Sequence, residues 1–100
     1  MKSTNDYLDA ELNKVIGEVL KKYREQEGLS LEELSNRLQN KIIRQNLHNY
    51  ENARTRLRLT RFIMICEALH LDPVEVFDEI NMKYLKNAKF FTETVKRKLL

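Results

Sequence analysis

Apolar residues recur every three or four positions along most of the chain, the spacing that places side chains on one face of an α-helix. The first such run extends from about residue 8 to residue 26. Its apolar face consists of Leu8, Leu12, Val15, Ile16, Val19, Leu20 and Tyr23. Gly28 follows the run and can adopt the left-handed conformation that ends many helices. The pattern therefore predicts a long amphipathic helix near the start of the sequence.

Two shorter helices are expected next. Ser30 and Glu33 have the spacing of a capping box, in which each side chain accepts a hydrogen bond from the other residue's amide. We therefore expect a helix to begin at Ser30. The apolar pattern breaks over residues 39–41, where Asn40 tolerates the left-handed conformation of a tight turn. A further helix is predicted from about residue 43 or 44 to residue 52.

The second half of the sequence predicts three more helices. A strongly apolar stretch that ends at Leu69 forms the first of them, with a cap near Thr60. Asp72 followed by Pro73 is a strong start signal, because aspartate caps a helix and proline suits the first helical position. This helix would cover residues 73–80, and a last one would cover residues 82–98 after Asn81. Six helices with no convincing strand and no internal repeat indicate an all-α fold.

Composition narrows the class of protein. Two glycines and one proline in 100 residues argue against turn-rich β architectures, and the length suits one domain. Charges interrupt every hydrophobic stretch, so no run approaches the ~20 apolar residues of a membrane span. Residues 1–6 lack the apolar core of a signal peptide. We therefore expect a cytoplasmic protein with no membrane partner.

The chemically reactive residues are few and scattered. Cys66 is the single cysteine, which excludes an internal disulfide, and it lies in an apolar run where a buried core thiol is expected. His48 and His70 lie far apart, so no metal site is predicted. No carboxylate pair, activated nucleophile or phosphate-cradling glycine loop is found. We expect neither an enzyme nor a bound cofactor.

Positive charge is concentrated in one fifth of the chain. The window 41–61 holds six basic residues against the single acid Glu51, a net charge of +5, whereas the whole chain carries +3. Such concentration is typical of proteins that bind a polyanion, although a solvated basic face would give the same pattern.

Residues 16–80 resemble the helix-turn-helix domain of the lambda-repressor-like family, also called the Cro or xenobiotic-response-element type. The resemblance covers about two thirds of the chain and rests on three segments in order: IGEVLKKYREQEGLSLEELSNRL, RQNLHNYEN and FIMICEALHLDPVEVF. It implies a compact five-helix DNA-binding domain over residues 1–80, with its core at about 16–80. Residues 81–100 would add a C-terminal helix.

The resemblance also implies particular contacts and shows some departures. Proteins of this type usually pair an arginine late in the first helix with a glutamate that ends the recognition helix, and Arg24 and Glu51 match these positions. The turn before the recognition helix is about two residues longer than usual. Ile43 stands where serine or threonine usually caps that helix, and Ala53 stands where glycine usually follows it.

The predicted helix 43–52 supplies candidate DNA-binding residues. An α-helix fits the major groove, where residues early on its exposed face reach the base edges. Arginine suits the acceptors of guanine, and glutamine or asparagine suits adenine. The base-contact candidates are Arg44, Gln45 and Asn49, with Asn46 and His48 in second place. The phosphate-contact candidates are Lys41, Arg54, Arg56 and Arg58, together with Asn52 by its match to the family. The alternative for Gln45 and Asn49 is a solvated polar face.

The C-terminal helix is the candidate for self-association. One such domain covers about one half-site, and proteins of this kind usually dimerise to read two. The apolar stripe available for this contact consists of Tyr84, Leu85, Ala88, Phe91 and Val95. The alternative is that this helix packs onto its own domain beside Leu8 and Leu12.

The leading hypothesis is a homodimeric, sequence-specific regulator of transcription that binds double-stranded DNA and, by the family resemblance, acts as a repressor. A second hypothesis is an antitoxin or another protein-interaction module whose C-terminal helix binds a partner protein. A partner chain that co-purifies, or the absence of any salt-sensitive binding to a DNA duplex, would favour the second.

Overall fold

The protein folds into five helices, which confirms the predicted all-α class. The computed structural model describes the backbone of residues 4–99 and the side chains of residues 6–87 and 93. The helices are α1 (Thr4–Gln26), α2 (Leu31–Arg37), α3 (Arg44–Glu51), α4 (Leu59–Ala68) and α5 (Pro73–Leu99). No strand occurs between residues 4 and 99.

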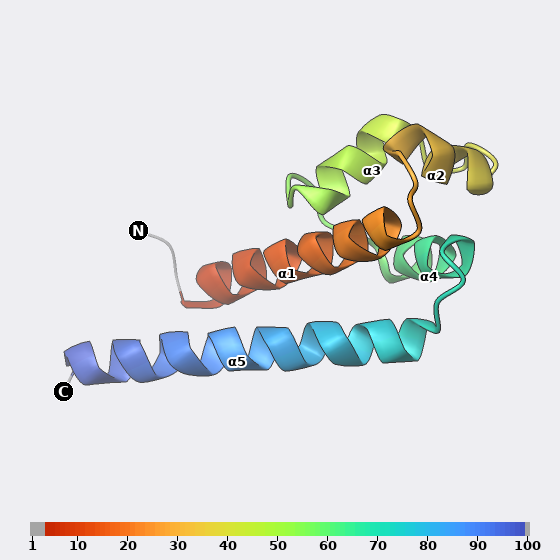
Figure 1. The fold of residues 1–100 in the computed structure, drawn as a ribbon. Coiled ribbons are helices and arrows are strands. Elements are labelled where there is room, and N and C mark those ends of the chain that lie inside the picture. The colour runs from red at the N-terminus through yellow and green to blue at the C-terminus, as the bar shows by residue number, and fades with distance from the viewer. Residues whose placement is uncertain (1–3, 100) are drawn as a thin grey trace.

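The two long helices form the frame of the molecule. Figure 1 shows α1 and α5 side by side and antiparallel, with α2 and α3 on the opposite side of α1. One core joins all five helices, because its buried side chains include Val19 of α1, Leu34 of α2, Leu47 of α3, Ile65 of α4 and Val76 of α5. Burial of each such side chain stabilises the fold by roughly 1.5–3 kcal/mol.

Local sequence signals set the ends of α1 and α2. Gly28 has a φ of +72°, and α1 ends two residues before it. At the start of α2, the Ser30 hydroxyl accepts from the amide of Glu33, and the Glu33 carboxylate accepts from the amide of Ser30, each at 3.0 Å. The predicted stop and the predicted capping box are both confirmed.

The turn between α2 and α3 uses two left-handed residues. Asn40 has a φ of +59°, as its residue type suggested, and Gln39 has a φ of +55°. A left-handed backbone is uncommon outside glycine and short polar residues. The Gln39 conformation was therefore not foreseen from the sequence.

Two predicted helix boundaries are wrong. Asn81 does not separate two helices, because α5 continues unbroken from Pro73 to Leu99. An i,i+4 ion pair between Lys83 and Glu79, at 3.3 Å, spans the predicted break, and no glycine or proline interrupts the helix there. The expected cap near Thr60 is also wrong, because α4 begins at Leu59 and its N-cap residue, Arg58, makes no side-chain capping bond.

Cys66 is a core residue. Its side chain is fully buried in α4, and burial raises the pKa of its thiol to about 11. Because the thiolate is the reactive form of cysteine, this thiol is chemically inert at neutral pH.

Candidate nucleic-acid interface

Close contact between backbones sets the position of α3 against α1. Gly17 lies in the middle of α1, and a Cβ added there would lie 2.7 Å from the carbonyl oxygen of Tyr50 and would also collide with that of Glu51. Both carbonyls belong to the last turn of α3. The absence of a side chain at Gly17 therefore allows the C-terminal end of α3 to rest directly on α1.

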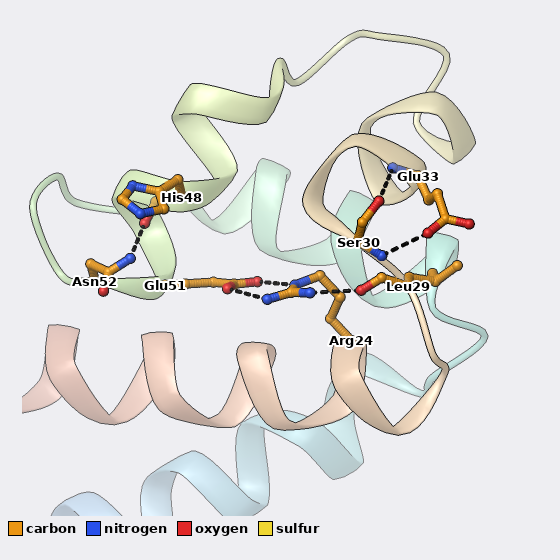
Figure 2. Close-up of polar contacts among 7 residues, drawn as sticks. All are labelled: Arg24, Leu29, Ser30, Glu33, His48, Glu51 and Asn52. Atoms are coloured by element: carbon orange, nitrogen blue, oxygen red, sulfur yellow. Dashed lines mark hydrogen bonds and ion pairs between the residues drawn. The ribbon is translucent and has the colours of Figure 1, made fainter.

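An ion pair holds the same end of α3. The Arg24 guanidinium donates to both carboxylate oxygens of Glu51, from Nε at 2.7 Å and from Nη2 at 2.9 Å (Figure 2). Its Nη1 donates to the carbonyl of Leu29, the residue that leads into α2, at 2.6 Å. The hydrogen bond to Glu51 raises the pKa of Arg24. One guanidinium from α1 thus connects the start of α2 to the end of α3.

Burial and one hydroxyl set the approach to α3. Ser35 is buried in α2 and donates to the carbonyl of Ile42 at 2.8 Å. Ile42 is 0% exposed, whereas the next residue, Ile43, is 55% exposed. The chain therefore turns outward between these two isoleucines, immediately before α3 begins at Arg44.

Two of the five base-contact candidates are fully exposed on α3. Arg44 and Gln45 are exposed, and Asn49 is partly buried. The Gln45 Nε2 donates to the Asn49 Oδ1 at 3.1 Å, one helical turn away. A glutamine amide has two donor hydrogens and one acceptor oxygen, so this bond leaves one N–H and the oxygen of Gln45 available to a ligand.

The remaining candidates on or next to α3 are Asn46, His48 and Asn52. Asn46 and His48 are partly buried, and the Nδ1 atom of His48 is buried without a hydrogen-bond partner among the described residues. Asn52 caps the end of α3 by donating from Nδ2 to the carbonyl of His48 at 2.8 Å (Figure 2). The structure thus exposes Arg44 and Gln45, leaves Asn46, His48 and Asn49 partly buried, and buries the Nδ1 atom of His48.

Exposed basic residues lie at both ends of α3. Lys41 precedes the helix, and Arg54 and Arg58 follow it in the loop before α4. Arg56 is also exposed, but its guanidinium forms an ion pair with Asp9 of α1. Arg61 does not belong to this exposed group, because it is partly buried and donates to the Tyr50 hydroxyl at 2.6 Å.

Polar contacts hold α5 against α1. Glu79 accepts hydrogen bonds from Lys22 and Tyr23, and Asn87 donates to Glu11 at 2.7 Å. Burial would raise the pKa of Glu79, but the bonds from Lys22, Tyr23 and Lys83 outweigh that effect and lower it to about 2.

Part of the surface of α5 remains apolar and exposed. Of the dimerisation candidates, Leu85 is 52% exposed and Tyr84 is partly buried, whereas the side chains of Ala88, Phe91 and Val95 lie outside the described residues. Phe77 is 56% exposed at an apolar hollow of about 130 Å³ that it shares with Leu12 and Ile16 of α1. The helix therefore packs on its own domain and still presents apolar groups outward.

Several positioning residues escaped the sequence analysis. A glycine within a helical pattern indicates close packing, and this signal could have identified Gly17. No comparable signal marks the contacts of Asp9 with Arg56 or of Arg61 with Tyr50, because only the fold brings those residues together.

Within the described part of the chain, no three metal-ligating side chains form a cluster, and none of the helices has the length and apolar character of a membrane span.

Comparisons with known proteins agree with this geometry. A sequence model of the helix-turn-helix domain family matches residues 15–77. Two crystal structures of the clp gene regulator ClgR from Corynebacterium glutamicum share the fold. One has a TM-score of 0.68 and 23% identity, over 88% of this chain and 89% of that one. The other has a TM-score of 0.64 and 22% identity, over 72% of this chain and 91% of that one. No match is found among the curated proteins.

Proposed function

Because this chain belongs to the helix-turn-helix domain family, we propose that it binds double-stranded DNA in a sequence-specific manner and regulates transcription. The observation that carries the proposal is the exposed face of α3, where Arg44, Gln45 and Asn49 lie between basic residues at both helix ends. In such domains the recognition helix enters the major groove. We further infer the lambda-repressor-like type, which the Arg24–Glu51 pair supports, and repression as the mode of regulation.

Gln45 and Asn49 are suited to read adenine. Their mutual hydrogen bond fixes both amides on the exposed face of α3, so less side-chain freedom is lost on binding. The free oxygen and N–H of Gln45 match the N6 donor and N7 acceptor of adenine. Arg44, one residue earlier, suits the paired acceptors of guanine. Asn46 and His48 are secondary candidates because they do not share the hydrogen bond that orients Gln45 and Asn49.

The exposed basic residues would hold the DNA backbone. Lys41, Arg54 and Arg58 can each neutralise a phosphate, which fixes the register of α3 without reading sequence. Arg56 would contribute less, because the Asp9 carboxylate already offsets its charge. Asn52 would present its remaining amide hydrogen to a phosphate at the end of α3.

We propose that residues 1–80 form the DNA-binding unit and that residues 81–100 take part in forming a homodimer. One domain contacts one half-site, and a dimer can read two half-sites about ten base pairs apart. Exposed apolar residues on α5, Leu85 and Met82 among them, support this assignment. The fold shared with a clp gene regulator supports a role in gene regulation.

Selection of bound duplexes from a random pool tests the proposal. We expect a two-fold symmetric motif, which we refer to as the operator. Arg44→Ala and Gln45→Ala should weaken operator binding by about 1–3 kcal/mol each and random-duplex binding much less. Arg54→Ala should weaken both alike and reduce the log–log salt slope by about 0.9, and Arg56→Ala should reduce it less.

Controls separate specific effects from general ones. Lys21→Ala removes an exposed lysine of α1, outside the proposed DNA and dimer contacts, and should leave DNA binding unchanged. An unenriched pool, or equal losses on operator and random duplex for Gln45→Ala, would contradict sequence reading. Leu85→Glu should convert a dimer to a monomer in sedimentation analysis. A second protein that co-purifies with the native chain would instead favour the partner-binding hypothesis.

A further inference from the structure

Ile43 is an exposed apolar residue at a position where a polar one would stabilise the helix. It is the N-cap of α3, with φ −76° and ψ 156°, and it makes no capping hydrogen bond. The N-cap of α2, Ser30, makes such a bond with the amide of Glu33. The start of α3 therefore lacks the stabilising side-chain hydrogen bond of a polar N-cap and has a branched hydrocarbon side chain at that position.

The protein core does not account for this isoleucine. Its side chain is 55% exposed and is not part of the buried cluster or of the residues packed against it, whereas the adjacent Ile42 is 0% exposed. Its exposed neighbours are Lys41, Arg44 and Gln45, all polar or charged. Ile43 is thus an apolar group within the polar surface that would face DNA.

The major groove offers one apolar group, the C5-methyl of thymine. Residues at the start of a recognition helix lie nearest to the base edges, and isoleucine has no donor or acceptor with which to read anything but that methyl. On the basis of the proposed function, we propose that Ile43 contacts the C5-methyl group of a thymine in each half-site. The operator then contains a thymine next to the base pairs read by Arg44 and Gln45.

Replacement of thymine by uracil tests this contact, because it removes the methyl and keeps the base pair. Each thymine of the selected operator is replaced in turn by deoxyuridine, and the Kd of the full chain is measured. We expect one position in each half-site at which the loss is about four-fold, the factor for removing one buried methyl group. Other thymines should show little change.

Variants link that methyl to Ile43. Ile43→Ser should bind the thymine and uracil operators equally, with a Kd near that of the unmodified protein on the uracil operator. Ile43→Val should keep part of the difference in Kd between the thymine and uracil operators. Val74→Ser, which removes another exposed branched side chain (73% exposed) from α5, should keep all of it. The melting temperature of Ile43→Ser should not fall, because serine can cap α3.

Each outcome decides between the two proposals. An operator that is enriched but insensitive to uracil at every position overturns the thymine contact and leaves sequence-specific binding intact. If Ile43→Ser still binds the thymine operator more tightly than the uracil operator, by the same factor as the unmodified protein, the assignment to Ile43 is overturned. A pool without enrichment overturns both proposals.

Discussion

The two helices of the helix-turn-helix unit begin in opposite ways. α2 begins with Ser30 and Glu33, whose side chains satisfy each other's backbone amides. α3 begins at Ile43 with no side-chain capping bond, although the two helices are similar in length. Local contacts therefore define the start of α2, whereas contacts with other parts of the chain hold α3.

Those distant contacts concentrate at the far end of α3. Gly17 permits the last turn of α3 to contact α1, and the Arg24 guanidinium forms an ion pair with the Glu51 carboxylate. The start of α3 is held mainly by burial of Ile42 and by the hydrogen bond from Ser35. In the first turn of α3, the Gln45 side chain bonds only to Asn49 of the same helix, so distant segments do not occupy its polar groups.

The largest expected effect comes from breaking the anchor at the end of α3. Glu51→Gln removes the charge opposite Arg24, whose side chain is 11% exposed, and should lower the free energy of unfolding by about 3 kcal/mol in urea titration. Glu18→Gln, an exposed change on α1, is the matched control and should stay within about 0.5 kcal/mol. A loss below 1 kcal/mol for Glu51→Gln would contradict the anchoring role.

Gly17→Ala tests the backbone contact with α3. Helix propensity alone would stabilise α1 by about 1 kcal/mol, but the collision with Tyr50 and Glu51 carbonyls should outweigh it. We expect a net loss of about 2 kcal/mol in thermal or urea unfolding. Weaker operator binding should accompany it, because α3 must move. A gain in stability would show that α3 adapts without cost.

Glu79→Gln tests an ion pair between α5 and α1 that does not involve α3. It should lower the free energy of unfolding by about 1 kcal/mol, discounted for partial exposure, and leave operator affinity unchanged. The folded pKa of Glu79 is about 2, below its ordinary value of 4.5, so its stabilisation is present above pH 4.5 and is lost as pH falls toward 2. Urea titrations across this range should show that dependence in the unmodified protein and less of it in the variant. An identical pH dependence in both would contradict the assignment.

The smallest effects compare the two helix starts directly. Ser30→Ala should lower the free energy of unfolding by about 1 kcal/mol, because the Glu33 amide loses its acceptor. Ile43→Ala should change it by less than about 0.5 kcal/mol, because no capping bond is lost. Equal losses of unfolding free energy in the two variants would contradict the conclusion that local contacts define the start of α2 and distant contacts hold α3.

The sequence determined those features that depend on residues close together in the chain. The periodic apolar faces, the capping box at Ser30, the stop at Gly28 and the left-handed Asn40 could all be predicted, because each depends on contacts within a few residues. The Arg24–Glu51 pair was expected only from the family resemblance, since no spacing rule relates two residues that far apart.

Only the tertiary structure decided which polar residues remain available for binding. Arg56 and Arg61 look like Arg54 and Arg58 in the sequence, yet the fold brings Asp9 to the first and Tyr50 to the second. The sequence likewise predicted a helix end at Asn81. In the structure α5 continues past this residue, where it packs on α1 and contains the Lys83–Glu79 ion pair. Local pattern fixes the helices because their bonds are local, whereas the partners of exposed charges depend on which distant segments the core places side by side.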